Sequence, residues 1–276
     1  MKKMKSFLSL IIAVLLVMCC LPVTSFAATR KNYLVLGDSI AYGQGIVNSE
    51  AACYGRIVAD TNGYNYSNYA VDGLTSGALL TYIGTSSVKN AIKEADIIQI
   101  SIGGNDFLTS NMFTLVITGF MGINTQYNSI QKSFASNLAK IITKIRSYNS
   151  GAKILMQTLY NPCNNNLRSI YQKGVNCINS SIKSYLSSNP GAYTIVDVES
   201  AFSGHTDYIA VDTIHPNSKG NLAIAKATLN VLGGKTTPVI NNPASDWTSS
   251  TQTTNFYSKF NNIANSLANL LNNIFG

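Results

Sequence analysis

The chain has 276 residues, of which 46% are hydrophobic and only 12% are charged, and its formal net charge is +8. This length suits one domain of roughly 200 residues with appended segments, and it is enough to bury a full core. The sequence has no cluster of lysine and arginine and no aromatic RNA-binding signature, which excludes nucleic acid as the expected partner.

The N-terminus has the parts of a bacterial-type export signal. Three lysines lie in the first five residues, residues 7–21 are apolar, and small residues precede a cleavage point after Ala27. We therefore expect residues 1–27 to be a signal peptide and the mature protein to be secreted. Cleavage removes three lysines and no acid, which leaves a net charge of +5. This mild positive charge favours anionic surfaces such as phospholipid or cell wall.

Two other interpretations of the N-terminus fit less well. A transmembrane anchor needs a run of roughly 18–20 apolar residues, and this run is shorter and is followed by a cleavage site. A lipoprotein signal would use Cys19, but Met18 stands before it where a small residue is expected.

Short apolar runs that end at glycine or polar residues predict a series of strands. Segments with apolar residues three and four positions apart predict the helices between them. Strands that alternate with helices favour an α/β fold, with a parallel sheet covered by helices on both faces. The predicted strands are residues 33–36, 64–70, 96–102, 153–159 and 193–198, and the clearest helices are residues 49–61, 127–148, 167–186 and 218–232. Residues 111–125 fit either a loop or a short helix.

The composition changes after the last helix of the domain. Residues 235–254 are rich in Thr, Pro, Asn and Ser, which predicts a linker between the domain at residues 28–234 and a final segment. Residues 255–276 have apolar positions at helical spacing and an Asn- and Ser-rich opposite face, so we expect an amphipathic helix. Its apolar face could fold back on the domain, contact a membrane or the cell envelope, or form a coiled coil.

Three cysteines follow the signal segment: Cys53, Cys163 and Cys177. Outside the cell Cys163 and Cys177 could pair, but spacing alone does not decide the connectivity. The sequence has no Cys-x-x-Cys and no His-Glu-x-x-His pattern, so no metal site is expected.

The first strand leads directly to a candidate nucleophile. Ser39 follows Gly37 and Asp38, which places a hydroxyl on a tight turn at the carboxyl end of a strand, where open α/β sheets bind ligands. A serine hydroxyl is a weak nucleophile until a base is brought to it. His215 is the candidate base, and Asp212, three residues earlier, can hold its imidazole in the required tautomer. We expect this pair at the end of the last strand. His205 lies in a loop-like stretch and is assigned no role.

Acyl transfer also needs hydrogen-bond donors for the oxyanion that develops on the substrate. Gly73, near the end of the second strand, lets a backbone N–H approach closely, although it could instead be a turn glycine. Asn105, after the third strand, has a side-chain amide. The backbone N–H of Ser39 is the third candidate donor.

The segments around Ser39, Gly73, Asn105 and Asp212–His215 follow one another as they do in the SGNH/GDSL hydrolase family. The chain resembles this family over residues 31–232, with Ile40 in place of the family's leucine. The resemblance implies a five-stranded sheet with flavodoxin-like strand order. It also implies that the serine, glycine and asparagine blocks supply Ser39, Gly73 and Asn105 to the oxyanion hole.

The expected activity is that of a secreted serine esterase or lipase that works through an acyl-enzyme with no metal and no organic cofactor. The substrate could be a lipid, a short acyl ester or an acetyl group on a polysaccharide. The alternative is a non-catalytic cell-surface or carbohydrate-binding module on a hydrolase-like scaffold. A binding module would not need the complete set of polar residues, which favours the enzyme.

Overall fold

The computed structural model describes residues 29–109, 112–249, 266, 269, 270 and 273. Residues 1–30 and 31–276 form two units, and the fold below is that of the second unit. The predicted signal peptide, residues 1–27, lies outside the described residues. So does most of the predicted C-terminal helix, whose four described residues are helical and exposed. No helix among the described residues is long and apolar enough to cross a membrane.

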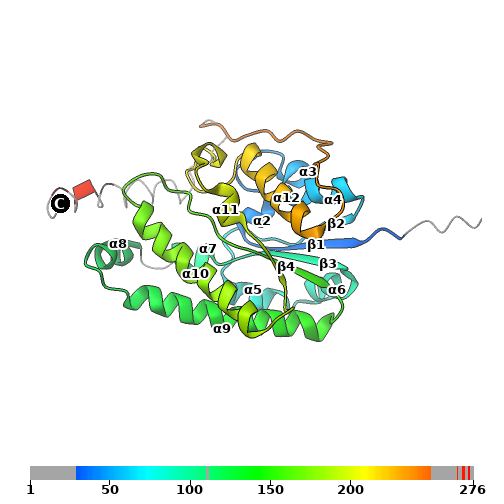
Figure 1. Cartoon of the computed structure of the whole chain (residues 1–276), viewed down its shortest axis with the longest axis horizontal. Helices are drawn as coiled ribbons and strands as arrows, with labels where there is room; N and C mark the ends of the chain where they lie inside the picture. Colours follow the sequence, from blue (N-terminus) through cyan, green and yellow to red (C-terminus); the bar gives the residue numbers. More distant parts are fainter. Residues whose placement is uncertain (1–28, 110–111, 250–265, 267–268, 271–272, 274–276) are drawn as a thin grey trace, which may run out of the picture. The chain divides into compact units, whose positions relative to one another are not determined.

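Five parallel strands form a single sheet (Figure 1). The strand order is β2-β1-β3-β4-β5, so the chain winds in one direction from β1 to β2 and in the other from β1 through β3 to β5. The predicted α/β fold with flavodoxin-like order is confirmed. The strands are β1 (Asn32–Gly37), β2 (Asn65–Asn68), β3 (Ile97–Ser101), β4 (Lys153–Gln157) and β5 (Thr194–Val196).

Helices cover both faces of the sheet. Figure 1 shows α5, α6, α9 and α10 on one face, with α4, α11 and α12 on the other. The helices are α2 (Ser39–Tyr42), α3 (Ser49–Ala52), α4 (Tyr54–Asn62), α5 (Ser76–Tyr82), α6 (Ser86–Glu94), α7 (Gly104–Leu108), α8 (Met112–Phe120), α9 (Thr125–Tyr148), α10 (Arg168–Ser188), α11 (Val198–Phe202), the 3-10 turn η1 (Thr206–Tyr208) and α12 (Ser218–Leu232).

The core has one half on each side of the sheet, because successive side chains of a strand point to opposite faces. In β1, Leu34 and Leu36 pack in the cluster that includes Phe134 of α9, while Tyr33 and Val35 pack in the cluster that includes Ile224 of α12. Burial on both faces explains why the central strands β1 and β3 are largely apolar in the sequence, whereas the edge strand β2 is polar and partly exposed.

The helix predicted over residues 49–61 is interrupted. Cys53 has an extended backbone, with φ −65° and ψ 163°, and it separates α3 from α4. Its side chain is fully buried, and the sulfur lies 3.1 Å from the hydroxyl of Tyr66. Periodicity did not reveal the break because the apolar residues keep helical spacing across it.

Part of the predicted linker also differs from expectation. The backbone N–H of Val239 donates to Thr61 Oγ1 at 2.9 Å. Further along, Val47 donates to the Ser245 carbonyl at 2.7 Å, and Ile46 and Asp246 form an antiparallel bridge. Residues 243–247, called the strap below, therefore lie against the domain, held largely by backbone groups whose hydrogen bonds leave no mark on composition.

Candidate active site

The turn after β1 is built so that only glycine fits at its first position. Gly37 has φ +138°, and a Cβ added there would lie 1.9 Å from the carbonyl oxygen of Ser101. The next residue, Asp38, donates its backbone N–H to the same carbonyl at 3.0 Å. The Asp38 carboxylate then caps α2 by accepting from Ile40 N at 3.1 Å. As a result Ser39, 5% exposed, is the first residue of α2.

The Asp212–His215 segment was expected at the end of the last strand, and the structure places it elsewhere. It follows α11 and η1 and ends shortly before α12, well beyond β5. One carboxylate oxygen of Asp212 accepts from the backbone N–H of Ile214 at 3.1 Å and of His215 at 3.0 Å. Thr213 has φ +67° and is the single non-glycine residue with positive φ among those described. The aspartate side chain thus holds a strained turn in place.

The same turn completes a chain of side-chain contacts. The second carboxylate oxygen of Asp212 contacts His215 Nδ1, and His215 Nε2 lies 2.9 Å from Ser39 Oγ. Asp212 and His215 are buried, as is Ser39. This is the arrangement of nucleophile, base and orienting acid that acyl transfer requires.

Two buried carboxyl groups near Ser39 have opposite pKa shifts. Burial raises the pKa of Asp38 to about 7, although the Ile40 hydrogen bond and the charge of His215 act the other way. Burial would also raise the pKa of Asp212, but the hydrogen bond and charge of the His215 ring, with the backbone N–H groups of His215 and Ile214, lower it below the usual range. Asp212 is therefore ionised at neutral pH, as an acid that orients an imidazole must be.

Besides the Ser39 N–H, the sequence predicted Asn105 and Gly73 as hydrogen-bond donors for the oxyanion, and the structure places these two residues differently. Asn105, the second residue of α7, is buried and donates its side-chain amide to the Leu74 carbonyl at 3.0 Å. It lines the same pocket as Ser39 and His215. Gly73 has φ +75° with open space around it, and it is not among the described residues that line this pocket. The structure connects Gly73 to the site through its neighbour Leu74.

The pocket beside Ser39 encloses about 60 Å³. Its walls come from α7, from the segment after β4, from α10 and from the Asp212–His215 turn. Most of the lining side chains are apolar: Ile40, Phe107, Leu108, Leu159, Tyr160, Pro162, Tyr171, Val175 and Ile214. Gly174 of α10 also lines it, and a Cβ there would lie 2.6 Å from the ring of Phe107. Such a pocket accommodates an apolar group next to the serine hydroxyl.

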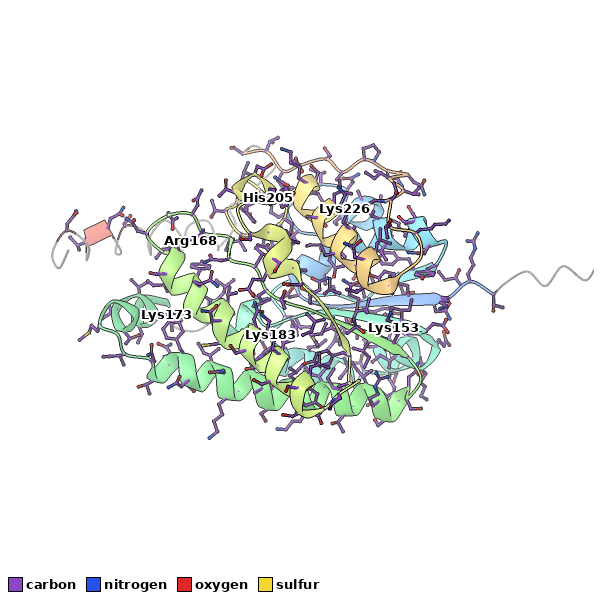
Figure 2. All side chains as sticks on the ribbon, viewed as in Figure 1. Lys153, Arg168, Lys173, Lys183, His205 and Lys226 are labelled. Atoms are coloured by element: carbon purple, nitrogen blue, oxygen red, sulfur yellow. The ribbon has the colours of Figure 1, made fainter. Side chains whose placement is uncertain are left out.

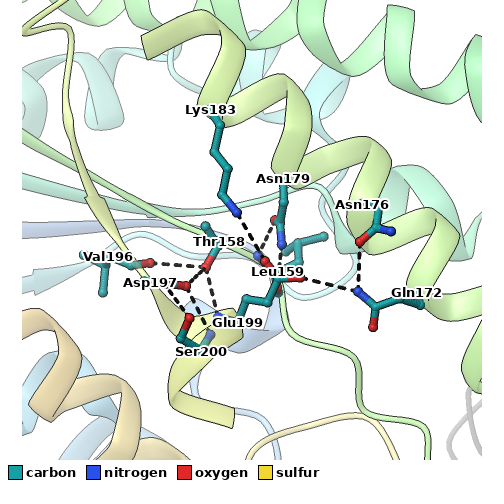
Figure 3. A network of polar contacts seen from close by, with 10 residues as sticks. All are labelled: Thr158, Leu159, Gln172, Asn176, Asn179, Lys183, Val196, Asp197, Glu199 and Ser200. Atoms are coloured by element: carbon teal, nitrogen blue, oxygen red, sulfur yellow. Dashed lines mark hydrogen bonds and ion pairs between the residues drawn. The ribbon is translucent and has the colours of Figure 1, made fainter. Parts of the chain in front are cut away.

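Sequence reasoning did not identify two residues that support this site. The buried hydroxyl of Tyr160 donates to the Ile214 carbonyl at 2.6 Å and so holds the turn before His215. Asn179 of α10 brackets Leu159, accepting from its N–H at 2.8 Å and donating to its carbonyl at 2.9 Å (Figure 3). The position of Tyr160 after β4, at the carboxyl edge of the sheet, was a usable signal. A polar residue within a helix, such as Asn179, carries no comparable signal.

His205 lies apart from these contacts. It lies at the surface beside η1 (Figure 2), and its side chain is 49% exposed. It lies 3.7 Å from Asp207 and stacks on Tyr208. Cys163 and Cys177 are both free thiols, and burial raises the pKa of Cys163 to about 12.

Residues 35–223 match the GDSL-like lipase/acylhydrolase family, and the chain belongs to that family of hydrolases. It is 28% identical over 214 residues to the uncharacterized protein YpmR of Bacillus subtilis, a match that covers 71% of this chain and 80% of that one. It is 25% identical over 202 residues to the spore germination lipase LipC of Bacillus licheniformis, covering 71% and 93%.

A solved structure with the same fold is that of the lipase Lip_vut3 from a goat rumen metagenome. It superposes with a TM-score of 0.60 at 23% identity, over 72% of this chain and 96% of that one. The match supports the fold assignment.

Proposed function

We propose that the protein is a serine esterase or lipase that hydrolyses carboxylic esters through an acyl-enzyme. The observation that carries the proposal is the hydrogen-bonded chain from Ser39 Oγ through His215 to Asp212 at an apolar pocket. The N-terminal pattern of residues 1–27 supports the further proposal that the enzyme is exported.

In the proposed reaction, Ser39 Oγ attacks the ester carbonyl carbon while His215 Nε2 takes its proton. The tetrahedral intermediate then collapses, the bond to the alcohol oxygen breaks, and His215 returns the proton to that oxygen. Water, activated by the same histidine, cleaves the acyl-serine ester and frees the acid. The ionised Asp212 keeps the imidazole oriented and stabilises its protonated form.

Charge develops on the carbonyl oxygen during both attacks, so that atom needs hydrogen-bond donors aimed at it. We assign this role to the backbone N–H of Ser39, the backbone N–H of Gly73 and the side-chain amide of Asn105. The hydrogen bond from Asn105 to the Leu74 carbonyl supports the assignment, because it holds the asparagine side chain next to the residue that follows Gly73.

The lining of the pocket favours an apolar acyl group over a polar one. Contact between apolar side chains and an apolar acyl group removes both surfaces from water, which makes the binding free energy more favourable. We therefore propose a lipid or a short acyl ester as substrate in preference to an acetylated polysaccharide. The lipase LipC among the relatives supports this choice.

Hydrolysis of chromogenic esters of increasing acyl length by the purified protein tests the proposal. Ser39→Ala should remove almost all activity with little change in stability, and a serine-reactive phosphonate should label the wild type at Ser39 alone. Ser147→Ala, at an exposed serine of α9, is the control and should match the wild type. Labelling at another residue, or full activity in Ser39→Ala, would refute the assignment.

A further inference from the structure

The strap brings the single tryptophan of the sequence against the proposed catalytic base. The ring centroids of Trp247 and His215 lie 6.1 Å apart with an interplanar angle of 71°, an edge-to-face contact. Both imidazole nitrogens are already used, Nδ1 by Asp212 and Nε2 by Ser39. The indole is therefore a third neighbour of the same ring, supplied by a segment outside the residues that match the family.

The strap is fastened directly beside that contact. The backbone N–H of Trp247 donates to the Gly45 carbonyl at 3.1 Å. The carboxylate of Asp246 accepts from Ser218 N at 2.6 Å and from Ser218 Oγ at 3.0 Å. Ser218 is the first residue of α12, where unpaired N–H groups and the helix dipole favour a carboxylate. Because Ser218 is only three residues after His215, this anchor holds the strap at the histidine.

The loop between the strap and the histidine packs closely against the His215 segment. Gly45 has φ +105°, and a Cβ there would lie 2.2 Å from the Pro216 carbonyl oxygen and 3.2 Å from the Cβ of His215. On its other side, Asn48 donates to the Pro243 carbonyl at 2.9 Å and accepts from Ser245 N at 2.9 Å. The strap, the Gly45 loop and the His215 segment are therefore packed together as one unit.

We propose that the strap is part of the active site and that Trp247 is a positioning residue for His215, an inference that rests on the proposed esterase function. The indole restrains the imidazole in the orientation that reaches Ser39.

Steady-state kinetics on a short soluble ester test the role in turnover. Trp247→Ala should lower kcat by about tenfold, the upper end of what an edge-to-face aromatic pair contributes, with KM little changed. Trp247→Phe keeps an aromatic ring and should recover most of the loss. Asp246→Ala, which releases the anchor on α12, should lower kcat in the same way. Ile240→Ala, an exposed residue before the strap, should match the wild type.

Fluorescence tests the contact without any need for activity. Trp247 is the sole indole, and a protonated imidazole quenches an adjacent indole, so emission should fall when the solution is acidified. This transition should vanish in His215→Gln and persist in His205→Gln. A transition that is unchanged in His215→Gln overturns the proposed contact.

The two experiments separate the two proposals. If the wild type is active, Ser39→Ala is inactive and Trp247→Ala keeps full kcat, the positioning role is wrong and the esterase assignment stands. If the wild type and Ser39→Ala both fail to hydrolyse every ester, the proposed function is wrong, and the positioning role that rests on it falls with it.

Discussion

Asp38 and Asp212 are both buried carboxyl groups beside the same serine, yet their surroundings are not equivalent. Asp212 accepts two backbone N–H groups and contacts the His215 ring, and these interactions more than offset its loss of hydration. Asp38 accepts the Ile40 N–H, and burial dominates its pKa of about 7. Because burial raises the pKa of Asp38, ionisation of this carboxyl group lowers the stability of the folded protein.

The first prediction concerns the unfolding free energy of Asp38→Asn. The folded pKa of Asp38 lies above the ordinary value near 4, so between these two pH values the folded state binds more protons than the unfolded state. Stability attributable to this group must therefore fall as the pH rises from about 4 to about 7. Asparagine keeps the acceptor for Ile40 and carries no charge, so the variant should escape that loss.

Urea denaturation at pH 4.5 and pH 8 measures the effect. The advantage of Asp38→Asn over the wild type should be small at the lower pH and should grow to at most about 4 kcal/mol at the higher pH. Asp72→Asn, at an exposed aspartate, should show no such growth. A constant difference between Asp38→Asn and the wild type would contradict the assignment.

The second prediction concerns the amide of Asn105. If it donates to the oxyanion, Asn105→Ala should lower kcat by about 10²–10³-fold with a smaller effect on KM, because the donor acts mainly on charge that develops in the transition state. Asn62→Ala, in α4 away from the pocket, provides the comparison. A change confined to KM would make Asn105 a substrate-binding residue instead.

At the scale of elements, apolar patterns located the central strands and the long helices because each of these buries a continuous apolar face. They did not locate the features that depend on a side chain bonding to the backbone. The Asp212 carboxylate builds the turn before His215 by accepting from two backbone N–H groups. Periodicity also missed the break at Cys53, where the backbone is extended and the cysteine side chain makes no capping hydrogen bond. The sequence predicted that Ser39, Asp212 and His215 belong to one site, and the structure brings these side chains together. Tyr160 and Asn179 act through contacts that only the folded chain reveals.

The packing of α10 on α7 gives the third prediction. Gly174 lets the ring of Phe107 lie against the helix backbone, and a Cβ there would lie within 2.6 Å of the ring. Gly174→Ala should therefore push Phe107 into the pocket, shift the preferred substrate toward shorter acyl chains and destabilise the fold by about 1–3 kcal/mol.

A series of esters from two to twelve carbons, together with thermal melting, measures both effects. The matched control is Gly77→Ala in α5, where the added Cβ would meet its nearest neighbour at an ordinary 3.5 Å. That change should be neutral or stabilising by up to about 1 kcal/mol, because alanine restricts the unfolded chain more than glycine does. An unchanged acyl preference in Gly174→Ala would mean that the acyl chain does not enter beside Phe107.

At the scale of the whole molecule, composition predicted a linker where the structure has a docked segment. The strap is polar and short, so it lacks the apolar repeat that marks a packed element. Its attachment comes from backbone groups and from Asp246 and Asn48, and its one large side chain, Trp247, meets His215. One feature of the sequence did point to a docked segment: a large aromatic residue, Trp247, within a Pro- and Asn-rich stretch.

The last prediction compares two shortened chains, one ending at Ser249 and the other at Gly234. Both lack residues 250–276, and only the shorter one lacks the strap. The loss of residues 235–249 removes several hydrogen bonds to α4, the Gly45 loop and the start of α12, each worth about 0.5–1.5 kcal/mol net, so the Tm of the shorter chain should be lower by roughly 5–10 °C. Its kcat should fall as in Trp247→Ala, because His215 loses the same neighbour. Calorimetry and ester hydrolysis on the two chains provide the measurement. Equal melting temperatures and equal kcat values would show that the strap contributes neither to the fold nor to the site.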